Sequence, residues 1–296
     1  MAGLRGVAVL AAILWVQTND GRLQAKAPED VQALPQLLSL PPETQGQASI
    51  ARMNLLCAQG LSATNGPDVP TCLAALDTWA QRVRSETERH LYRFKQNPAD
   101  FENSQGFFRM LMLAVVLAED FGVHYDPQKR VDPTSARMED GFFADPKDVF
   151  IHGLLGPEQR GTCSSLPVLY VAIGRELGYP LKLVTTKGHL FVRWEDGKER
   201  FNVEATNHGL SRFADDYYRH WPFEVSAAEE AAEGHLKSLS PAAELAVFLS
   251  IRSMCQREVG RLKEAAESFD AARKLVPNCR SYQAMGTELR RRLGAA

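Results

Sequence analysis

Three residues have the side chains that a thiol-based acyl transfer needs: Cys163, His189 and Glu204. A cysteine nucleophile requires a base that takes its proton, and the base requires a partner that orients its ring. The pair Asp196-Gly197 is a strong hairpin signal, and a two-residue loop there places His189 directly opposite Glu204 on neighbouring strands. Opposite residues share one face of a sheet, with Cβ atoms about 5 Å apart. We therefore predict a hydrogen-bonded imidazole and carboxylate.

The sulfur is expected at the N-terminus of a helix. An apolar pattern at helical spacing follows Cys163 over residues 164–177, and Gly178-Tyr179-Pro180 ends it. Proline is tolerated only in the first turn of a helix, so Pro167 places the helix start close to the cysteine. Unpaired N–H groups and the helix dipole at such an end favour a thiolate.

Each part of this site also has a simpler explanation. A cysteine is often a buried and inert side chain, and a histidine–glutamate pair is often a surface ion pair. A metal site built from the same three residues lacks a fourth ligand, so we expect no metal and no cofactor. Gln159 is a candidate second oxyanion donor beside the backbone N–H of Cys163, and His152 is better explained as a loop histidine.

Three strands and several helices are predicted around these residues. Residues 181–186, 189–195 and 198–205 are rich in branched and aromatic side chains and are separated by short glycine-containing turns. Upstream, helical spacing of apolar residues covers 71–95 and 106–121, and residues 125–159 form a long irregular connection. These elements predict an α+β fold.

The motifs resemble the transglutaminase-like branch of the papain-like superfamily. In that branch a Gly-x-Cys motif opens a helix, a Gly-x-Pro motif ends it, and a histidine and an acidic residue follow on consecutive strands. The corresponding segments here are Gly161-Thr162-Cys163, Gly178-Tyr179-Pro180, Gly188-His189 and Val203-Glu204, within about residues 145–222. The resemblance implies a cysteine-bearing helix packed on a small antiparallel sheet. Glu204 stands where these proteins usually have aspartate.

The implied activity is attack of Cys163 on an amide or ester bond of a peptide or protein, with His189 as base and Glu204 orienting the ring. Peptidase, amidase and acyl-transfer reactions all remain open. The alternative is a catalytically idle module of the same fold that binds a peptide or a protein.

The C-terminal residues 241–296 have the spacing of a tetratricopeptide-like unit, carried by Gly260, Ala265, Phe269, Ala272 and Pro277. One such unit cannot bury its faces alone, so it is expected to dock on the rest of the chain, and it offers a surface for a protein partner. A transglutaminase-like core joined to such a tail resembles a bacterial subgroup.

The N-terminus reads as a targeting signal, because Arg5 precedes the apolar run of residues 7–16. Ten apolar residues cover about half the hydrocarbon core of a bilayer, so the run suits a signal peptide better than a stable membrane span. A cut after Ala25 and an uncleaved anchor both stay open, because Leu23 stands where a small residue is preferred, and either predicts export to the periplasm or outside the cell. The predicted organisation is a signal or anchor (1–25), a helical region (26–144), the core (145–222), a linker (223–240) and the tail (241–296).

The composition of the chain bears on its binding partners and on the state of its cysteines. The chain has 296 residues and a formal net charge of -2, from 34 basic and 36 acidic residues, so no overall field attracts nucleic acid. The five cysteines are an odd number for an exported chain. Cys57 and Cys72 either form a disulfide or are two small buried side chains.

Overall fold

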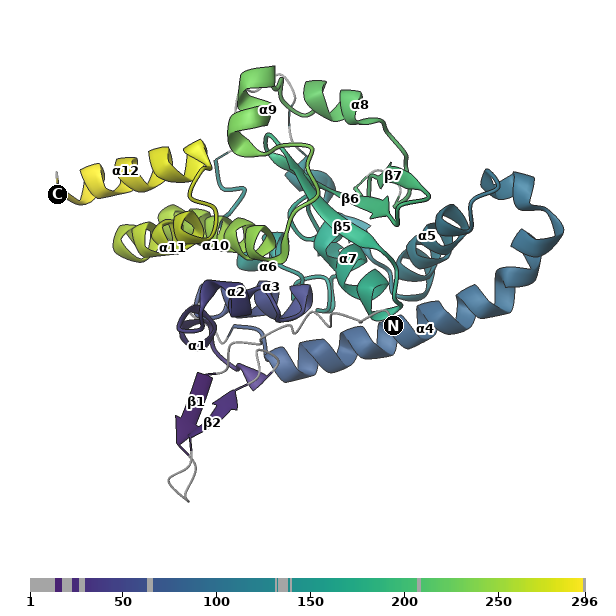
Figure 1. The fold of residues 1–296 in the computed structure, drawn as a ribbon, viewed down its shortest axis with the longest axis horizontal. Coiled ribbons are helices and arrows are strands. Elements are labelled where there is room, and N and C mark those ends of the chain that lie inside the picture. The colour runs from purple at the N-terminus through teal and green to yellow at the C-terminus, as the bar shows by residue number, and fades with distance from the viewer. Residues whose placement is uncertain are drawn as a thin grey trace, which may run out of the picture.

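The structure is a computed structural model that describes residues 14–17, 23–26, 30–62, 66–130, 132, 138, 140–206 and 209–294 (Figure 1). Strands β1 (Leu14–Gln17) and β2 (Leu23–Lys26) pair as an antiparallel ribbon. The rest of the predicted targeting segment, residues 1–13 and 18–22, lies outside the described residues. None of the described helices has both the length and the apolar content needed to cross a bilayer.

A set of helices precedes the core: α1 (Leu34–Leu38), α2 (Pro42–Gln45), α3 (Ile50–Ala58), α4 (Val69–Gln96), η2 (Pro98–Phe101), α5 (Gln105–Val115) and its π-helical extension η3 (Val116–Asp120). Serines begin two of these helices, because the hydroxyls of Ser49 and Ser104 accept hydrogen bonds from N–H groups of the first turn. The helices α4 and α5 with η3 match the helical spacing in the sequence to within two residues at each end.

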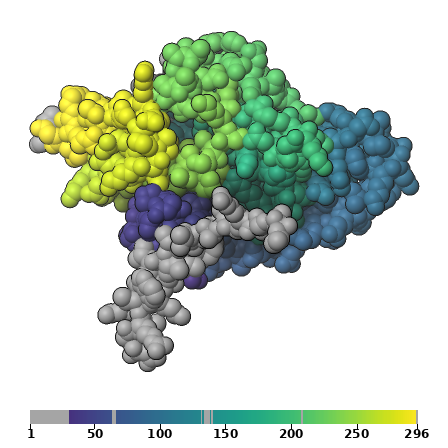
Figure 2. Space-filling model, in the orientation of Figure 1, coloured from purple at the N-terminus to yellow at the C-terminus, as the bar shows by residue number. Residues whose placement is uncertain are grey.

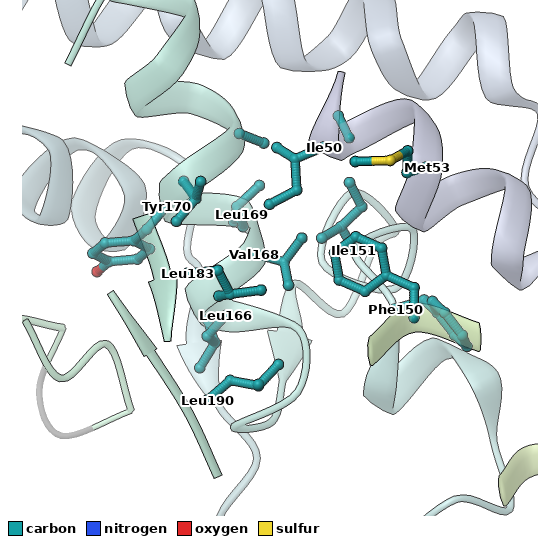
Figure 3. Packing of buried hydrophobic residues seen from close by; sticks show 14 of the residues in the cluster. Ile50, Met53, Phe150, Ile151, Leu166, Val168, Leu169, Tyr170, Leu183 and Leu190 are labelled. Atoms are coloured by element: carbon teal, nitrogen blue, oxygen red, sulfur yellow. The ribbon is translucent and has the colours of Figure 1, made fainter. Parts of the chain in front are cut away.

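The core contains α6 (Pro146–Val149), α7 (Leu166–Glu176) and an antiparallel sheet of β5 (Leu181–Thr186), β6 (His189–Glu195) and β7 (Arg200–Val203). Near it, the 3-10 turn η4 (Pro127–Lys129) follows β3 (His124–Tyr125), which pairs in parallel with β4 (Arg160–Gly161). Figure 3 shows side chains of α7, including Val168, between Leu183 and Leu190 of the sheet and Ile50 and Met53 of α3. The mixed helix and small-sheet fold agrees with the predicted class.

The predicted hairpin register is wrong by two residues. The observed pairs are Val192 with Val203, Trp194 with Phe201 and Glu195 with Arg200, so the turn has four residues instead of two. The Asp196 carboxylate causes the longer turn, because it accepts the N–H groups of Lys198 and Glu199 at 2.8 and 2.7 Å. The third strand is therefore shorter than predicted. A shift of two residues keeps every side chain on its predicted face of the sheet.

The C-terminal part contains α8 (Asp215–His220), α9 (Ala227–Glu233), α10 (Pro241–Glu258), α11 (Leu262–Leu275) and α12 (Arg280–Gly294). Helix α11 packs on α10, and α12 packs on α11. Space-filling atoms of these helices lie directly against the N-terminal helices and the core (Figure 2). Arg252 helps to hold the tail, since it donates to the backbone carbonyls of Cys57 and Gln59 at 2.8 and 2.6 Å.

The five cysteines are free thiols, so Cys57 and Cys72 form no disulfide in the structure. Cys57 lies in the main hydrophobic core, where burial raises the pKa of its thiol to about 12. Burial, with the nearby Asp68 carboxylate, raises the pKa of half-buried Cys72 to about 11. The alternative of small packed side chains therefore describes this pair.

Candidate active site

Cys163 lies in the tight turn that leads into α7. The helix itself begins at Leu166, two residues later than predicted, with Ser165 as the residue before it and Pro167 in its first turn. The Thr162 carbonyl accepts the N–H groups of Ser165 and Leu166 at 3.2 and 3.0 Å, which closes the turn around the cysteine. The sulfur is therefore carried by the approach to the helix N-terminus and not by the helix.

Two hydroxyl groups fix this turn to a distant part of the chain. Thr162 Oγ1 and Ser165 Oγ donate to the backbone carbonyl of Asp148 at 2.8 and 2.9 Å, and Ser165 Oγ also accepts the Thr162 N–H at 3.0 Å. All of these groups are buried, so the loss of one hydrogen bond would leave a polar group unpaired inside the protein. No pattern in the sequence predicts this role, because nothing in the order of residues places α6 beside the turn.

The turn between β5 and β6 brings the histidine to the sulfur. Gly188 has a φ of +73°, and a Cβ there would lie 2.5 Å from a ring carbon of Phe223, so the position requires glycine. Its carbonyl oxygen lies 3.9 Å from the Cys163 sulfur as an acceptor of the thiol proton. His189 is the next residue and begins β6. The backbone of this turn therefore lies next to the thiol.

His189 and Glu204 form the predicted pair in spite of the corrected register. Nε2 of the ring lies 2.7 Å from Oε2 of the carboxylate, and the two residues are 3% and 1% exposed. Thr206 completes the shell of the carboxylate, because its N–H and hydroxyl donate to Oε1 at 3.0 and 2.6 Å. Both carboxylate oxygens thus have partners, which orients the imidazole.

The surroundings of this pair favour the charged forms of both side chains. Burial disfavours protonation of His189, but the Glu204 carboxylate and the Cys163 side chain outweigh it and raise the pKa of the histidine to about 10. Burial also disfavours the Glu204 anion, yet His189 and the Thr206 donors lower the pKa of this carboxyl. At neutral pH the pair is therefore an imidazolium and a carboxylate.

The second ring nitrogen of His189, Nδ1, takes no part in the contact with Glu204. Nδ1 is buried and makes no hydrogen bond of regular geometry within the described part of the chain, although Cys163 is close enough to raise the pKa of the ring. Buried polar atoms in proteins are usually paired, so an unpaired one at a candidate site needs an explanation. A ring nitrogen that exchanges a proton with the adjacent thiol provides that explanation.

Aromatic rings cover the histidine. The Trp221 ring meets it edge-on with a centroid distance of 4.6 Å, and the Tyr218 ring lies nearly parallel at 6.2 Å. Tyr218 is itself stacked on Phe191 at 3.8 Å. These rings keep water from the pair, and they strengthen its electrostatic interaction because the local dielectric is low.

The other two residues singled out in the sequence have contacts of their own. Gln159 has a φ of +45°, its carbonyl accepts the His124 N–H at 3.1 Å, and its side-chain oxygen lies against Gly122. His152 packs near the Phe150 ring, and burial lowers its pKa to about 4. No cluster of three or more histidine, cysteine, aspartate or glutamate side chains suited to a metal ion occurs among the described residues.

Comparison with known proteins identifies a family over most of this region. The family model described as the transglutaminase-like superfamily matches residues 70–247, which is more than half of the chain. The matched region includes α4, α5, the whole sheet and the first part of α10. No curated protein and no solved structure matches the chain.

Proposed function

The chain belongs to the transglutaminase-like superfamily, and on this premise we propose that it is a thiol enzyme acting on amide or ester carbonyls of peptides or proteins. Cys163 is the proposed nucleophile, His189 the proposed acid–base residue and Glu204 the residue that orients the ring. The observation that supports this proposal is the 2.7 Å contact between His189 Nε2 and Glu204, which leaves Nδ1 unpaired beside the thiol.

The proposed reaction has two stages. The Cys163 sulfur attacks the carbonyl carbon as a thiolate, its proton having passed to His189, and a carbon–sulfur bond forms. The carbon–nitrogen or carbon–oxygen bond then breaks, and the leaving amine or alcohol takes the proton from His189. Water or an amine next attacks the thioester and loses its proton to His189, and that proton finally returns to the sulfur. The three residues are compatible with either water or an amine as the acyl acceptor.

The burial of the thiol leads to a sharp test. Cys163 is only 2% exposed, whereas Cys72 is half-buried, so accessibility alone predicts that iodoacetamide labels Cys72 first. The Cys72 thiol has a pKa raised to about 11 and is a poor nucleophile at neutral pH. We expect labelling of Cys163 at pH 7 to be at least about tenfold faster than labelling of Cys72, as measured by mass spectrometry of the labelled peptides.

The same experiment addresses the second candidate function, a catalytically idle binding module. The observation that favours this alternative is the near-complete burial of the Cys163 side chain. If the order of labelling follows exposure, with Cys72 ahead of Cys163, the enzyme proposal is wrong and the binding module becomes the better description.

We also propose roles for the C-terminal helices and for the N-terminal apolar run. The packing of α10, α11 and α12 in succession supports a tetratricopeptide-like tail that offers a surface to a protein partner. The apolar run after Arg5 supports export from the cell. Fractionation of cells that express the full chain, with N-terminal sequencing of the exported form, tests the second point. Recovery of the uncut chain in the cytoplasm alone would contradict it.

A further inference from the structure

A cavity of about 220 Å³ lies between the core and the tail, beside the candidate active site. Its core wall includes Ser164, Gly188 and His189, and its tail wall includes Ala243, Val247 and Ile251 of α10. Ser164 is the residue after the candidate nucleophile, and the carbonyl of Gly188 is the acceptor next to the sulfur. The cavity therefore begins one residue away from Cys163.

The tail wall is held in place by hydrogen bonds to the core. The backbone N–H groups of Leu236 and Leu239 donate to carbonyls of β5 at 2.9 Å each, so the segment after α9 follows the edge of the sheet. At the end of α9 the Glu233 carboxylate accepts the Ser281 N–H at 3.0 and 3.1 Å and the Cys279 thiol at 3.1 Å. This contact joins α9 to α12. The cavity is consequently enclosed by a fixed wall and not by a loosely attached appendage.

The lining of the cavity is mainly apolar. Besides the α10 residues, Met138, Phe143, Leu239 and Val276 contribute to it. The Glu233 carboxylate in the lining is engaged with α12 and the His189 ring with Glu204, and burial lowers the pKa of His235, so the cavity offers little to a charged group. Burying a charge in such surroundings is costly, whereas an apolar group gains from leaving water. An apolar cavity of about 150 Å³ can hold a benzene molecule, so this one has room for a leucine- to phenylalanine-sized side chain.

We propose that this cavity is the subsite for an uncharged apolar side chain of the substrate, next to the carbonyl that Cys163 attacks, and that α10 is its outer wall. The inference rests on the proposed function and adds a substrate class to it. It also assigns the tail a place in the site, because α10 supplies one side of the cavity.

Binding to the Cys163→Ser variant of the full chain separates this proposal from catalysis. We expect N-acetyl-phenylalaninamide to bind at least about tenfold more tightly than N-acetyl-glycinamide in an NMR titration, because only the former buries an apolar side chain. Adding Ala243→Leu fills the cavity and should reduce the preference to about threefold or less. Adding Ala228→Leu, a matched change at an exposed position of α9, should leave the preference intact.

A second variant tests the cavity independently, so that a failure of Ala243→Leu to fold does not decide the result. Val247→Ala enlarges the cavity and should shift the preference toward a tryptophan amide over the phenylalanine amide. Equal affinity for the glycine and phenylalanine amides, or a preference that neither variant changes, would overturn the subsite. A reactive Cys163 combined with either result would leave the enzyme proposal standing. Selective binding to an unreactive protein would instead support the cavity and end the proposed catalysis.

Discussion

Two buried polar networks lie on the same face of β6, and they differ in how completely they are satisfied. At Arg193, which is 1% exposed, the guanidinium donates to Asn202 Oδ1 at 2.8 Å, to the Leu236 carbonyl at 2.9 Å and to Asp215 Oδ1 at 2.7 Å. Each of its three nitrogens has a partner. At His189, four residues earlier, one ring nitrogen is paired with Glu204 and the other is not.

This difference separates a structural network from a candidate reactive one. The Arg193 network ties β6 to β7, α8 and the segment after α9, and each of the three guanidinium nitrogens already donates to a protein group. The His189 pair is equally buried, yet it keeps one ring nitrogen beside a thiol. Burial and charge are therefore common to both networks. An unpaired Nδ1 also occurs at His90, His152 and His235, so the proposed site is distinguished by the thiol that lies next to the unpaired nitrogen.

The largest expected effect comes from removing the imidazole. His189→Ala should slow iodoacetamide labelling of Cys163 at pH 7 by about a thousandfold, because no other group near the thiol is proposed to take its proton. Peptide mass spectrometry measures the rate, and Asn202→Ala in the other network is the matched control. Equal slowing in the two variants would mean that both act only through the fold.

The next effect is on stability and belongs to the Arg193 network. Arg193→Met should lower the free energy of unfolding by about 3 kcal/mol, because Asp215 and Asn202 lose a buried partner. Urea denaturation measures the change. Labelling of Cys163 in the folded variant should stay within about threefold of the original rate, since the network has no donor directed to the thiol. A loss of reactivity as large as that of His189→Ala would erase the distinction between the networks.

The smallest effect, measured per pH unit, is a dependence of stability on pH. A histidine with a pKa raised to about 10 stabilises the folded state fully below its unfolded pKa of about 6.5, and this contribution is lost as pH rises toward 10. The stability difference between the original chain and His189→Gln should therefore shrink between pH 6.5 and 10, by at most about 1.4 kcal/mol per pH unit.

Arg193→Met supplies the contrast for this measurement. An arginine stays protonated through the same range, so its stability difference should be nearly constant with pH. Urea titrations at several pH values compare the two variants. A stability difference between the original chain and His189→Gln that grows with pH would contradict the assignment of a protonated ring.

Much of the local structure could be predicted from the sequence. Pro167 is in the first turn of α7, and the spacing over residues 71–95 marks most of α4. The resemblance to the transglutaminase-like superfamily, based on short motifs around Cys163 and His189, is confirmed by the family match over residues 70–247. These features depend on residues that are close in the chain, where backbone sterics and helix periodicity decide the outcome.

The turn between β6 and β7 shows where such reasoning fails. Asp-Gly favours a two-residue loop, but the Asp196 side chain binds two N–H groups and makes a four-residue turn. His189 and Glu204 still meet, because side chains alternate with a period of two and the register changed by two. The contact is thus diagonal between the strands instead of directly across them.

The sequence by itself determined which residues carry the candidate chemistry and which face of the sheet they share, since periodicity along a strand or helix is a local property. Only the tertiary structure decided how the thiol turn is anchored to Asp148, how Thr206 completes the carboxylate, and how α10 closes a cavity beside His189. Those contacts join segments far apart in the chain, and their geometry follows from the packing of the whole core, which no local pattern specifies.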